Sequence, residues 1–221
     1  MGFTNNNDKT FYDFCKRIVD IIFSTLLLII FSPIILVVAI AIKSESEGTI
    51  LADTPERVGY KGRKFKMYKF RSMVKDAHTI LRNDPKYAEL YSRYKKGSYK
   101  LKDDPRITKV GRFIRKYSLD ELPQFLNVLE GEMSIVGPRA YYPDELEEQQ
   151  KKYPYTRQAV KIVLSVKPGI TGFWQVTGRS EINFDKRIQM DANYARRGSV
   201  LYDLLIILKT PWAMISGRGA L

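Results

Sequence analysis

The sequence predicts an α+β fold that is mainly α, with an N-terminal re-entrant membrane helix and a basic cytoplasmic domain. We expect this domain to contain interfacial amphipathic helices and a small β-hairpin. Three observations predict this fold class: an uncharged apolar run near the N-terminus, helical and extended hydrophobic patterns after that run, and an excess of basic residues. At 221 residues the chain suits one compact domain with an appendage. We divide it into residues 1–48, with the membrane helix, and residues 49–221, the cytoplasmic domain.

Composition limits the partners and the chemistry. Lys and Arg number 37 against 24 Asp and Glu, a net charge of +13 at pH 7. This excess favours an anionic partner, such as nucleic acid, phospholipid headgroups or a phosphorylated substrate. Cys15 is the single cysteine and His78 the single histidine, so an internal disulfide and a Cys/His zinc site are excluded. Chemistry must rest on carboxylates, hydroxyls, Lys and Arg; we interpret Cys15 as a small buried group and His78 as a surface residue.

The apolar run covers residues 21–42. At ~1.5 Å per residue it reaches ~33 Å, which is enough to cross a bilayer core. Its length and the absence of a small-residue cleavage site after it argue against a signal peptide. Ser32 and Pro33 lie near its midpoint, where the proline ring clashes with the carbonyl of Ile29, so the helix must bend or break there. The Ser32 hydroxyl can bond a carbonyl freed at the bend.

Basic residues flank the run on both sides. Lys9, Lys16 and Arg17 precede it, and Lys43, Arg57, Lys61, Arg63 and Lys64 follow it. Because positive charge favours the cytoplasmic side, this pattern places both ends there and predicts a re-entrant helix. A kinked helix that crosses the bilayer once is the alternative.

Two segments predict amphipathic helices. Residues 108–117 combine apolar positions spaced i, i+3, i+4, i+7 with basic ones, typical of a helix at a membrane interface. An ordinary core-facing helix with a solvated basic side is equally compatible with this pattern. Residues 199–216 repeat the apolar stripe, and Trp212 can lie at headgroup level.

Other segments predict short strands. Residues 49–73 interleave basic and apolar side chains, which favours strands or extended loops, whereas residues 78–99 are polar and partly helical. Residues 160–176 alternate apolar and polar positions before a Pro168-Gly169 turn. This alternation predicts the β-hairpin.

Asp120 and Glu121 form an adjacent carboxylate pair in the expected first turn of a helix that runs to Leu129. A structural role is well supported by spacing alone, because Ser118 and Glu121 match a capping box and acids suit helix N-termini. Three basic residues precede the pair: Arg112, Arg115 and Lys116. An aspartate kept ionised by such cations is a workable nucleophile toward phosphorus. The neighbouring glutamate can share Mg²⁺ with a diphosphate.

Two glycine turns each present an arginine. One is Gly137-Pro138-Arg139 and the other is Gly178-Arg179. A guanidinium suits bidentate phosphate binding, although a salt bridge that closes the loop is the alternative for Arg139. The sequence contains no Walker-type loop, Rossmann fingerprint or Ser/His/Asp arrangement.

Taken in order, these strings resemble the bacterial sugar transferase family, the monotopic polyprenyl-phosphate phosphoglycosyl transferases. The resemblance covers residues 14–216 and rests on residues 16–20, the Ser32-Pro33 break, and residues 65–73, 118–124, 127–131, 137–139, 167–172 and 178–179. The family commonly has proline after the arginine of the Gly-Pro-Arg turn, whereas Ala140 stands here and leaves the loop less rigid. Compared with the longest members, no N-terminal multi-span region is present, so we expect a stand-alone catalytic core.

The resemblance implies a reaction and its residues. A sugar-1-phosphate passes from a UDP-sugar to undecaprenyl phosphate with release of UMP, at the cytoplasmic face of the bacterial inner membrane, as the first membrane step of a surface-glycan pathway (capsule, exopolysaccharide or lipopolysaccharide). Asp120 becomes the nucleophile that forms a covalent phosphosugar intermediate, and Glu121 binds Mg²⁺ with it. Candidate phosphate- or substrate-binding residues are Lys69, Arg115, Arg139, Arg179 and Asp191.

Alternative functions remain at this stage. A non-catalytic basic membrane adaptor could bind anionic lipid in a polysaccharide assembly system, with the acid pair merely capping a helix. Nucleic-acid binding is suggested only by charge and interleaved aromatic residues and is disfavoured by the membrane segment, so we expect no nucleic acid. The expected partners are the UDP-sugar, undecaprenyl phosphate and membrane phospholipid. The sugar, the pathway and the oligomeric state, including a homodimer, stay open.

Overall fold

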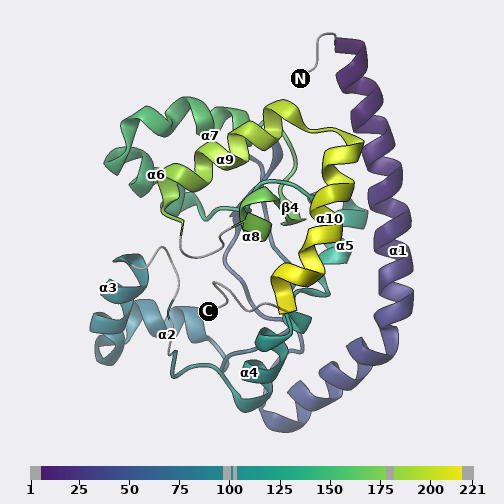
Figure 1. Cartoon of the computed structure of the whole chain (residues 1–221). Coiled ribbons are helices and arrows are strands. Elements are labelled where there is room, and N and C mark those ends of the chain that lie inside the picture. Colours follow the sequence, from purple (N-terminus) through teal and green to yellow (C-terminus); the bar gives the residue numbers. More distant parts are fainter. Residues whose placement is uncertain (1–5, 97–100, 102–103, 178–181, 216–221) are drawn as a thin grey trace.

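A long N-terminal helix bends around one side of a mainly helical body (Figure 1). The computed structural model describes residues 6–96, 101, 104–177 and 182–215. Its α-helices are α1 (Asn6–Glu45), α2 (Ala77–Asn83), α3 (Ala88–Lys96), α4 (Lys109–Lys116), α5 (Gln124–Glu130), α6 (Pro143–Lys152), α7 (Arg157–Val163), α8 (Phe173–Thr177), α9 (Phe184–Arg197) and α10 (Val200–Ile215). Its strands are β1 (Arg57–Val58), β2 (Lys64–Phe65), β3 (Ser134–Val136) and β4 (Gly169–Thr171). This confirms the mainly α, α+β class.

The helix α1 remains helical through Pro33. Figure 1 shows it running along one edge of the body and then turning beneath it. Proline removes the N–H that would bond the carbonyl of Ile29. The Ser32 hydroxyl donates to that carbonyl instead, at 2.8 Å, as the sequence predicted. The helix therefore bends without breaking, and a side chain satisfies the freed acceptor.

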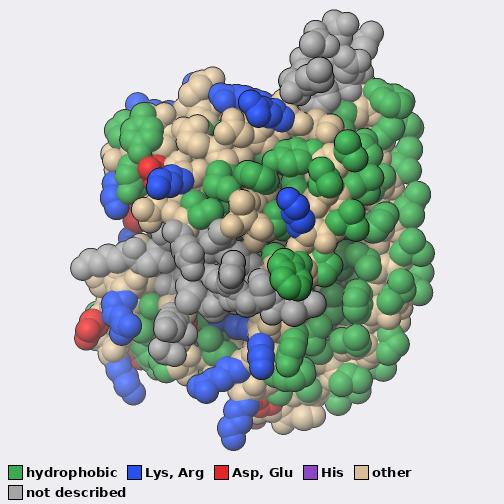
Figure 2. Space-filling view, in the orientation of Figure 1, with side chains coloured by type: hydrophobic (Ala, Val, Ile, Leu, Met, Phe, Trp, Pro, Cys, Tyr) green, Lys and Arg blue, Asp and Glu red, His purple; other side chains and the backbone are tan. Residues whose placement is uncertain are grey.

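The outer face of α1 is apolar. Within the described residues, Thr10–Glu45 forms a helix long and apolar enough to cross a membrane by length and composition. Its exposed side chains include Phe14, Ile22, Ile29 and Val37. Figure 2 shows hydrophobic side chains gathered along this edge, in contrast to the Lys and Arg on other parts of the same face. The surface is compatible with membrane association.

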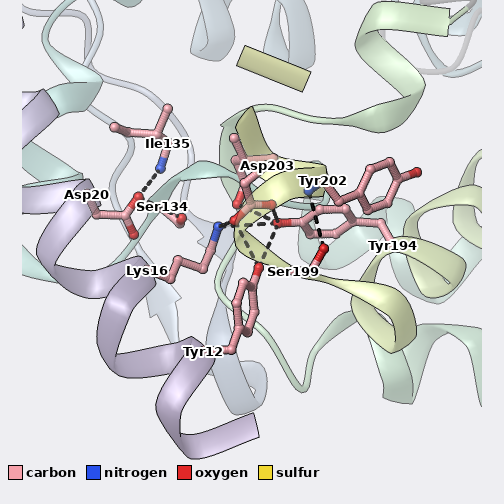
Figure 3. A network of polar contacts seen from close by, with 10 residues as sticks. Tyr12, Lys16, Asp20, Ser134, Ile135, Tyr194, Ser199, Tyr202 and Asp203 are labelled. Carbon is pink, nitrogen blue, oxygen red and sulfur yellow. Dashed lines mark hydrogen bonds and ion pairs between the residues drawn. The ribbon is translucent and has the colours of Figure 1, made fainter. Parts of the chain in front are cut away.

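The inner face of α1 carries polar side chains that hold it to the body (Figure 3). Lys16 Nζ lies 2.5 Å from Asp203 Oδ2 in α10, and Tyr12 donates to the same oxygen at 2.9 Å. Tyr194 in α9 donates to the other oxygen of Asp203 at 2.6 Å. One turn further along α1, Asp20 accepts from the backbone N–H of Ile135 at 2.9 Å. Because these bonds are buried or half-buried, the first half of α1 is fixed to α9, α10 and β3.

The middle and second half of α1 cover the segment that contains the predicted acid pair. Buried Val38 and Ile42 share a hydrophobic cluster with Phe70, Leu122 and Phe125. The predicted domain border at residue 48 lies just beyond the end of α1, and the division into two domains stays a prediction.

The two sheets differ from the predicted arrangement. β1 and β2 pair antiparallel, with Arg57 opposite Phe65, which confirms short strands in residues 49–73. β3 and β4 pair parallel, with Ser134 opposite Gly169. The predicted hairpin at residues 160–176 is therefore wrong: the segment begins in α7, continues into β4 and ends in α8.

The helical burial of α7 explains that error. Ala159, Val160 and Val163 are buried at helical spacing and pack against α9, whereas the alternating Ile162 is only half-buried. A parallel partner for β4 also requires a crossover connection instead of a hairpin turn.

The predicted amphipathic helices are confirmed as α4 and α10. In α4, Ile114 is buried, whereas Phe113 and Tyr117 are 58% and 50% exposed. In α10, Ile206 is buried, whereas Trp212 is 75% exposed on the outer stripe. Both helices therefore pack through one narrow face and present a second apolar face outward. α2 and α3 likewise confirm the partly helical character of residues 78–99.

Candidate active site

A cavity of about 1280 Å³ lies beneath the bend of α1. Of the residues predicted to act together, its walls contain Lys69, Arg115, Asp120, Glu121 and Arg139. Arg179, predicted to bind phosphate, lies outside the described residues. Phe23, Leu27 and Phe31 of α1 and Ile207 of α10 line the same cavity. Charged and apolar walls therefore meet in one space.

The acid pair lies in a 3-10 turn, Leu119–Glu121, that precedes α5. Ser118 has φ of 55°, and its side chain makes no capping hydrogen bond among the described residues. The capping-box interpretation is therefore wrong. The physical reason is that the N–H of Ser118 closes the end of α4 on the carbonyl of Arg115, which removes Ser118 from the extended conformation that an N-cap needs.

Two cations lie beside this turn. Lys69 Nζ is 2.6 Å from Glu121 Oε1, and the side chains of this ion pair are 23% and 38% exposed. Arg115 Nε donates to the Ser72 hydroxyl at 2.8 Å, which holds the guanidinium at the cavity wall. The backbone N–H of Phe70 donates to the carbonyl of Asp120 at 2.9 Å. This bond keeps residues 69–72 against the acid pair.

Asp120 is buried, with 7% of its surface exposed. Burial raises its pKa to about 6, and the charge of Glu121 acts in the same direction. Lys69 and Arg115 oppose this shift because their positive charges stabilise the carboxylate. At neutral pH the carboxylate is mostly ionised but poorly solvated. That is the state a nucleophile requires.

The far end of α5 is bound to α1. Arg17 donates to the carbonyls of Val128 and Leu129, at 2.5 Å and 2.8 Å. Both carbonyls lie in the last turn of α5, where helical N–H donors run out. The Val128 carbonyl also accepts from the Gly131 N–H at 3.0 Å, and Arg17 adds a side-chain donor at this helix end. Gly131 ends the helix with φ of 84°. From the sequence, Arg17 was interpreted only as a charge that flanks the apolar run. Its contact with α5 was missed, because no local pattern reveals a partner more than 100 residues away.

The loop that carries Arg139 is held from behind by Asp191. Asp191 Oδ2 accepts from the Arg139 N–H at 3.1 Å and from the Tyr141 hydroxyl at 3.0 Å. Arg57 donates to the carbonyl of Ala140 at 3.1 Å. Side-chain hydrogen bonds therefore restrain the loop where the family commonly has a second proline.

Asp191 itself is fully buried. Burial raises its pKa to about 7, although the Arg139 N–H and the Tyr141 hydroxyl favour the charged form. Because Asp191 is absent from the described cavity lining and binds the loop from behind, it is a positioning residue for Arg139. The sequence left its role open.

Further cavity residues were missed. Arg57, Arg71, Arg106 and Trp174 also line the walls. His78 lies among them and is half-buried, so its interpretation as a surface residue is wrong. Burial, reinforced by Arg106, lowers its pKa to about 4, which leaves the imidazole neutral. The basic composition of residues 63–71 was a signal for Arg71, whereas Arg57, Arg106 and Trp174 lie outside that stretch.

The acid pair fits a Mg²⁺ site completed by phosphate. Asp120 and Glu121 supply hard carboxylate oxygens at adjacent positions on the cavity wall. In the structure, the ammonium group of Lys69 is the cation bound to the Glu121 carboxylate. Within the described residues, no cluster of three or more His, Cys, Asp or Glu side chains could hold a metal ion. Two carboxylates plus substrate phosphates are a usual arrangement for Mg²⁺.

Comparison with known families decides the relationship. The family model described as bacterial sugar transferase matches residues 11–217, which include nearly all of the described structure. The chain belongs to the bacterial sugar transferase family. The resemblance drawn from its motifs is thereby confirmed.

Relatives of this bacterial sugar transferase differ in length. It is 40% identical over 98% of its length to the undecaprenyl-phosphate galactose phosphotransferase of Salmonella typhimurium, and covers 44% of that protein. It is 42% identical over 93% of its length to the UDP-glucose:undecaprenyl-phosphate glucose-1-phosphate transferase of Klebsiella pneumoniae, and covers 41% of it. It is 39% identical to the exopolysaccharide production protein ExoY of Sinorhizobium fredii, and covers 87% of it. The chain thus spans less than half of the first two relatives and most of the third.

Proposed function

We propose that this protein transfers a sugar-1-phosphate from a UDP-sugar to undecaprenyl phosphate and releases UMP. The observation that carries the proposal is a buried Asp120 beside Glu121, Lys69 and Arg115 in a cavity that apolar residues of α1 also line. The names of the Salmonella and Klebsiella relatives support the reaction class. That of ExoY supports a role in exopolysaccharide production.

In the first step, a carboxylate oxygen of Asp120 attacks the β-phosphorus of the UDP-sugar. The bond from this phosphorus to the bridging oxygen breaks, and UMP leaves with the electron pair. Asp120 then carries the sugar phosphate as an acyl phosphate. Arg115 and Lys69 are placed to neutralise the phosphoryl oxygens, since both line the cavity next to Asp120.

In the second step, a phosphate oxygen of undecaprenyl phosphate attacks the same phosphorus and displaces the Asp120 carboxylate. Two displacements at one aspartate allow a water-soluble donor and a lipid acceptor to use the site in turn. Asp120 and Glu121 would hold Mg²⁺, which offsets negative charge on the transferred phosphoryl group. Arg139, whose backbone is held by Asp191, contributes a further guanidinium to the cavity wall.

The lipid acceptor is expected to enter between α1 and α10. Phe23, Leu27 and Phe31 of α1 line the cavity, and so does Ile207 of α10. Both helices also expose apolar side chains outward, among them Ile22 and Trp212. An apolar chain can therefore remain beside these helices while its phosphate reaches Asp120.

We further propose that α1 is re-entrant and that the catalytic part lies at the cytoplasmic face of the bacterial inner membrane, in contact with phospholipid. The bend in α1, the basic flanks and the outward faces of α4 and α10 support this arrangement. Cysteines introduced at Thr10 and Ser46, in a Cys15→Ser background, should both react with a membrane-impermeant reagent only from the cytoplasmic side. Labelling from opposite sides would contradict the re-entrant arrangement.

A direct test of the reaction is to capture the intermediate. Purified enzyme in nanodiscs is incubated with Mg²⁺ and a panel that includes UDP-glucose and UDP-galactose, and UMP release is measured with and without undecaprenyl phosphate. Intact-mass and peptide analysis should find a sugar-phosphate adduct on the peptide that contains Asp120. A non-catalytic adaptor predicts neither UMP nor adduct. Product formation without any adduct at Asp120 would refute the covalent mechanism.

A further inference from the structure

We propose that Lys69 holds the place of the divalent cation in the donor-free enzyme, so that the metal enters together with the donor diphosphate. This inference rests on the proposed function and adds to it an order of binding. It assigns to Lys69 a gating role toward the metal besides phosphate neutralisation.

The geometry places one ammonium group against the acid pair. Lys69 Nζ lies 2.6 Å from Glu121 Oε1, an ordinary distance for a charge-assisted hydrogen bond. Lys69 is also the cation that most strongly favours the ionised form of Asp120. The Lys69 charge thus acts on both carboxylates that the metal would need.

A metal and this ammonium group compete for the same oxygen. Mg²⁺ binds carboxylate oxygens at about 2.0–2.1 Å, so a divalent ion on Glu121 Oε1 would lie within a few ångströms of Lys69 Nζ. Two cations at that separation repel each other strongly in a half-buried site. The metal can therefore bind well only after Lys69 has moved.

The donor diphosphate supplies the reason for Lys69 to move. Its phosphate oxygens offer the ammonium a new partner, and they also provide ligands that Mg²⁺ lacks in a site with two carboxylates. Lys69 has a flexible four-carbon stem, which permits this exchange. Arg115 is held by the Ser72 hydroxyl and by contrast stays in place.

A nearby lysine provides a matched control. Lys66 lies three residues before Lys69 and pairs with Asp53 at 3.3 Å, with both side chains largely exposed (66% and 85%). Lys66→Met removes the same charge as Lys69→Met without touching the acid pair. Lys69→Arg retains the charge, and Lys69→Gln is a second neutral variant in case the methionine variant folds poorly.

The experiment measures binding of Mn²⁺ alone, as a Mg²⁺ substitute, to enzyme in phosphatidylcholine nanodiscs without nucleotide. Free Mn²⁺ is quantified by electron paramagnetic resonance. Lys69→Met and Lys69→Gln should bind Mn²⁺ about tenfold more tightly than the wild type, because a neighbouring positive charge is removed. Lys66→Met and Lys69→Arg should match the wild type. The double variant Lys69→Met/Glu121→Gln should lose the gain.

Unchanged or weaker Mn²⁺ binding in both neutral variants would overturn the inference. So would an equal gain in Lys66→Met, since the effect would then be one of general charge. The covalent adduct at Asp120 is measured separately on the wild type. Its failure would refute the proposed function, whereas its presence with unchanged Mn²⁺ binding would refute only the role of Lys69.

Discussion

Charged groups are placed in opposite situations at the open end of the site, where the acid pair lines the cavity, and at its enclosed end, in the protein interior behind the cavity wall. At the acid-pair end, Lys69 and Glu121 form an ion pair whose side chains are 23% and 38% exposed. Behind the Arg139 loop, Arg187 and Glu145 form an ion pair at 2.8 Å whose side chains are 2% and 1% exposed. The first pair can exchange partners with a ligand, whereas the second is enclosed by protein. Exposure therefore separates the ion pair that can meet substrate from the ion pair that only supports the fold.

The enclosed pair is also surrounded by aromatic rings. The Arg187 guanidinium lies 5.3 Å from the ring centre of Tyr141 and 5.4 Å from that of Trp174. Such contacts stabilise a buried cation that has lost its hydration. Removing one charge at the open end should impair chemistry, and removing one at the enclosed end should impair folding.

The largest effect is expected for Asp120→Asn. The amide cannot attack phosphorus, so UMP release should fall on the order of 10⁶-fold, as for loss of a catalytic nucleophile elsewhere. The variant should remain folded, because asparagine has nearly the same volume. UMP release and circular dichroism check these two expectations, and near-normal turnover would contradict the comparison between the two ends.

Arg187→Met should instead reduce the free energy of unfolding by about 3–5 kcal/mol, because it leaves Glu145 as a buried unpaired charge. Denaturant titration in detergent measures the change. Lys151→Met is the control, since its ion pair with Glu147 is exposed (72% and 69%), so solvent screens it and its removal should leave stability nearly unchanged. Equal effects of the two substitutions would remove the distinction based on burial.

The pH dependence sharpens the description of the open end. Because the pKa of Asp120 is raised to about 6, kcat/KM should fall roughly tenfold per pH unit below that value as the nucleophile is protonated. Arg115 lowers this pKa, so Arg115→Met should move the acid limb to higher pH. If kcat/KM of the wild type fell only below about pH 4, Asp120 would have an ordinary pKa and would be well solvated.

Asp191→Ala tests positioning from the enclosed side. Loss of the carboxylate leaves the Arg139 N–H and the Tyr141 hydroxyl without their acceptor, which should raise KM for the donor about tenfold with less effect on kcat. Asp191→Asn retains an acceptor oxygen and should restore most of the affinity. Steady-state kinetics decide this, and a loss of kcat alone in both variants would indicate direct participation of Asp191.

The smallest expected effect is the pH-dependent change in thermal stability caused by Asp120→Asn. The folded pKa of Asp120 lies above its ordinary value of 3.8, so the folded state binds this proton more tightly than the unfolded state. Its contribution to stability therefore decreases as pH rises from about 4 to about 6 and stays unfavourable above that. Asp120→Asn should raise Tm by roughly 2–4 °C at pH 7.5 and by much less at pH 4, as measured by differential scanning fluorimetry. An equal gain at both pH values would contradict this sign.

The sequence predicted features whose cause is local. The Ser32 hydrogen bond to Ile29 follows from one proline and one hydroxyl within a single helical turn. The helices α4 and α10 follow from their apolar spacing. The capping box failed because the backbone at Ser118 is set by the end of α4. The hairpin failed because burial against α9, and not alternation, decides the conformation of residues 157–163.

By itself, the amino-acid sequence determined the class of fold, the bend of α1 and the residue types able to attack and bind phosphate, because periodicity, proline and charge act over a few residues. Only the tertiary structure decided which cations meet Asp120, that Arg17 caps α5 and that Asp191 lies behind the Arg139 loop. Such contacts join residues that are 50 to more than 100 positions apart. These contacts depend on how the helices pack. Packing is the result of many weak contacts between distant residues, and a short sequence pattern does not predict them.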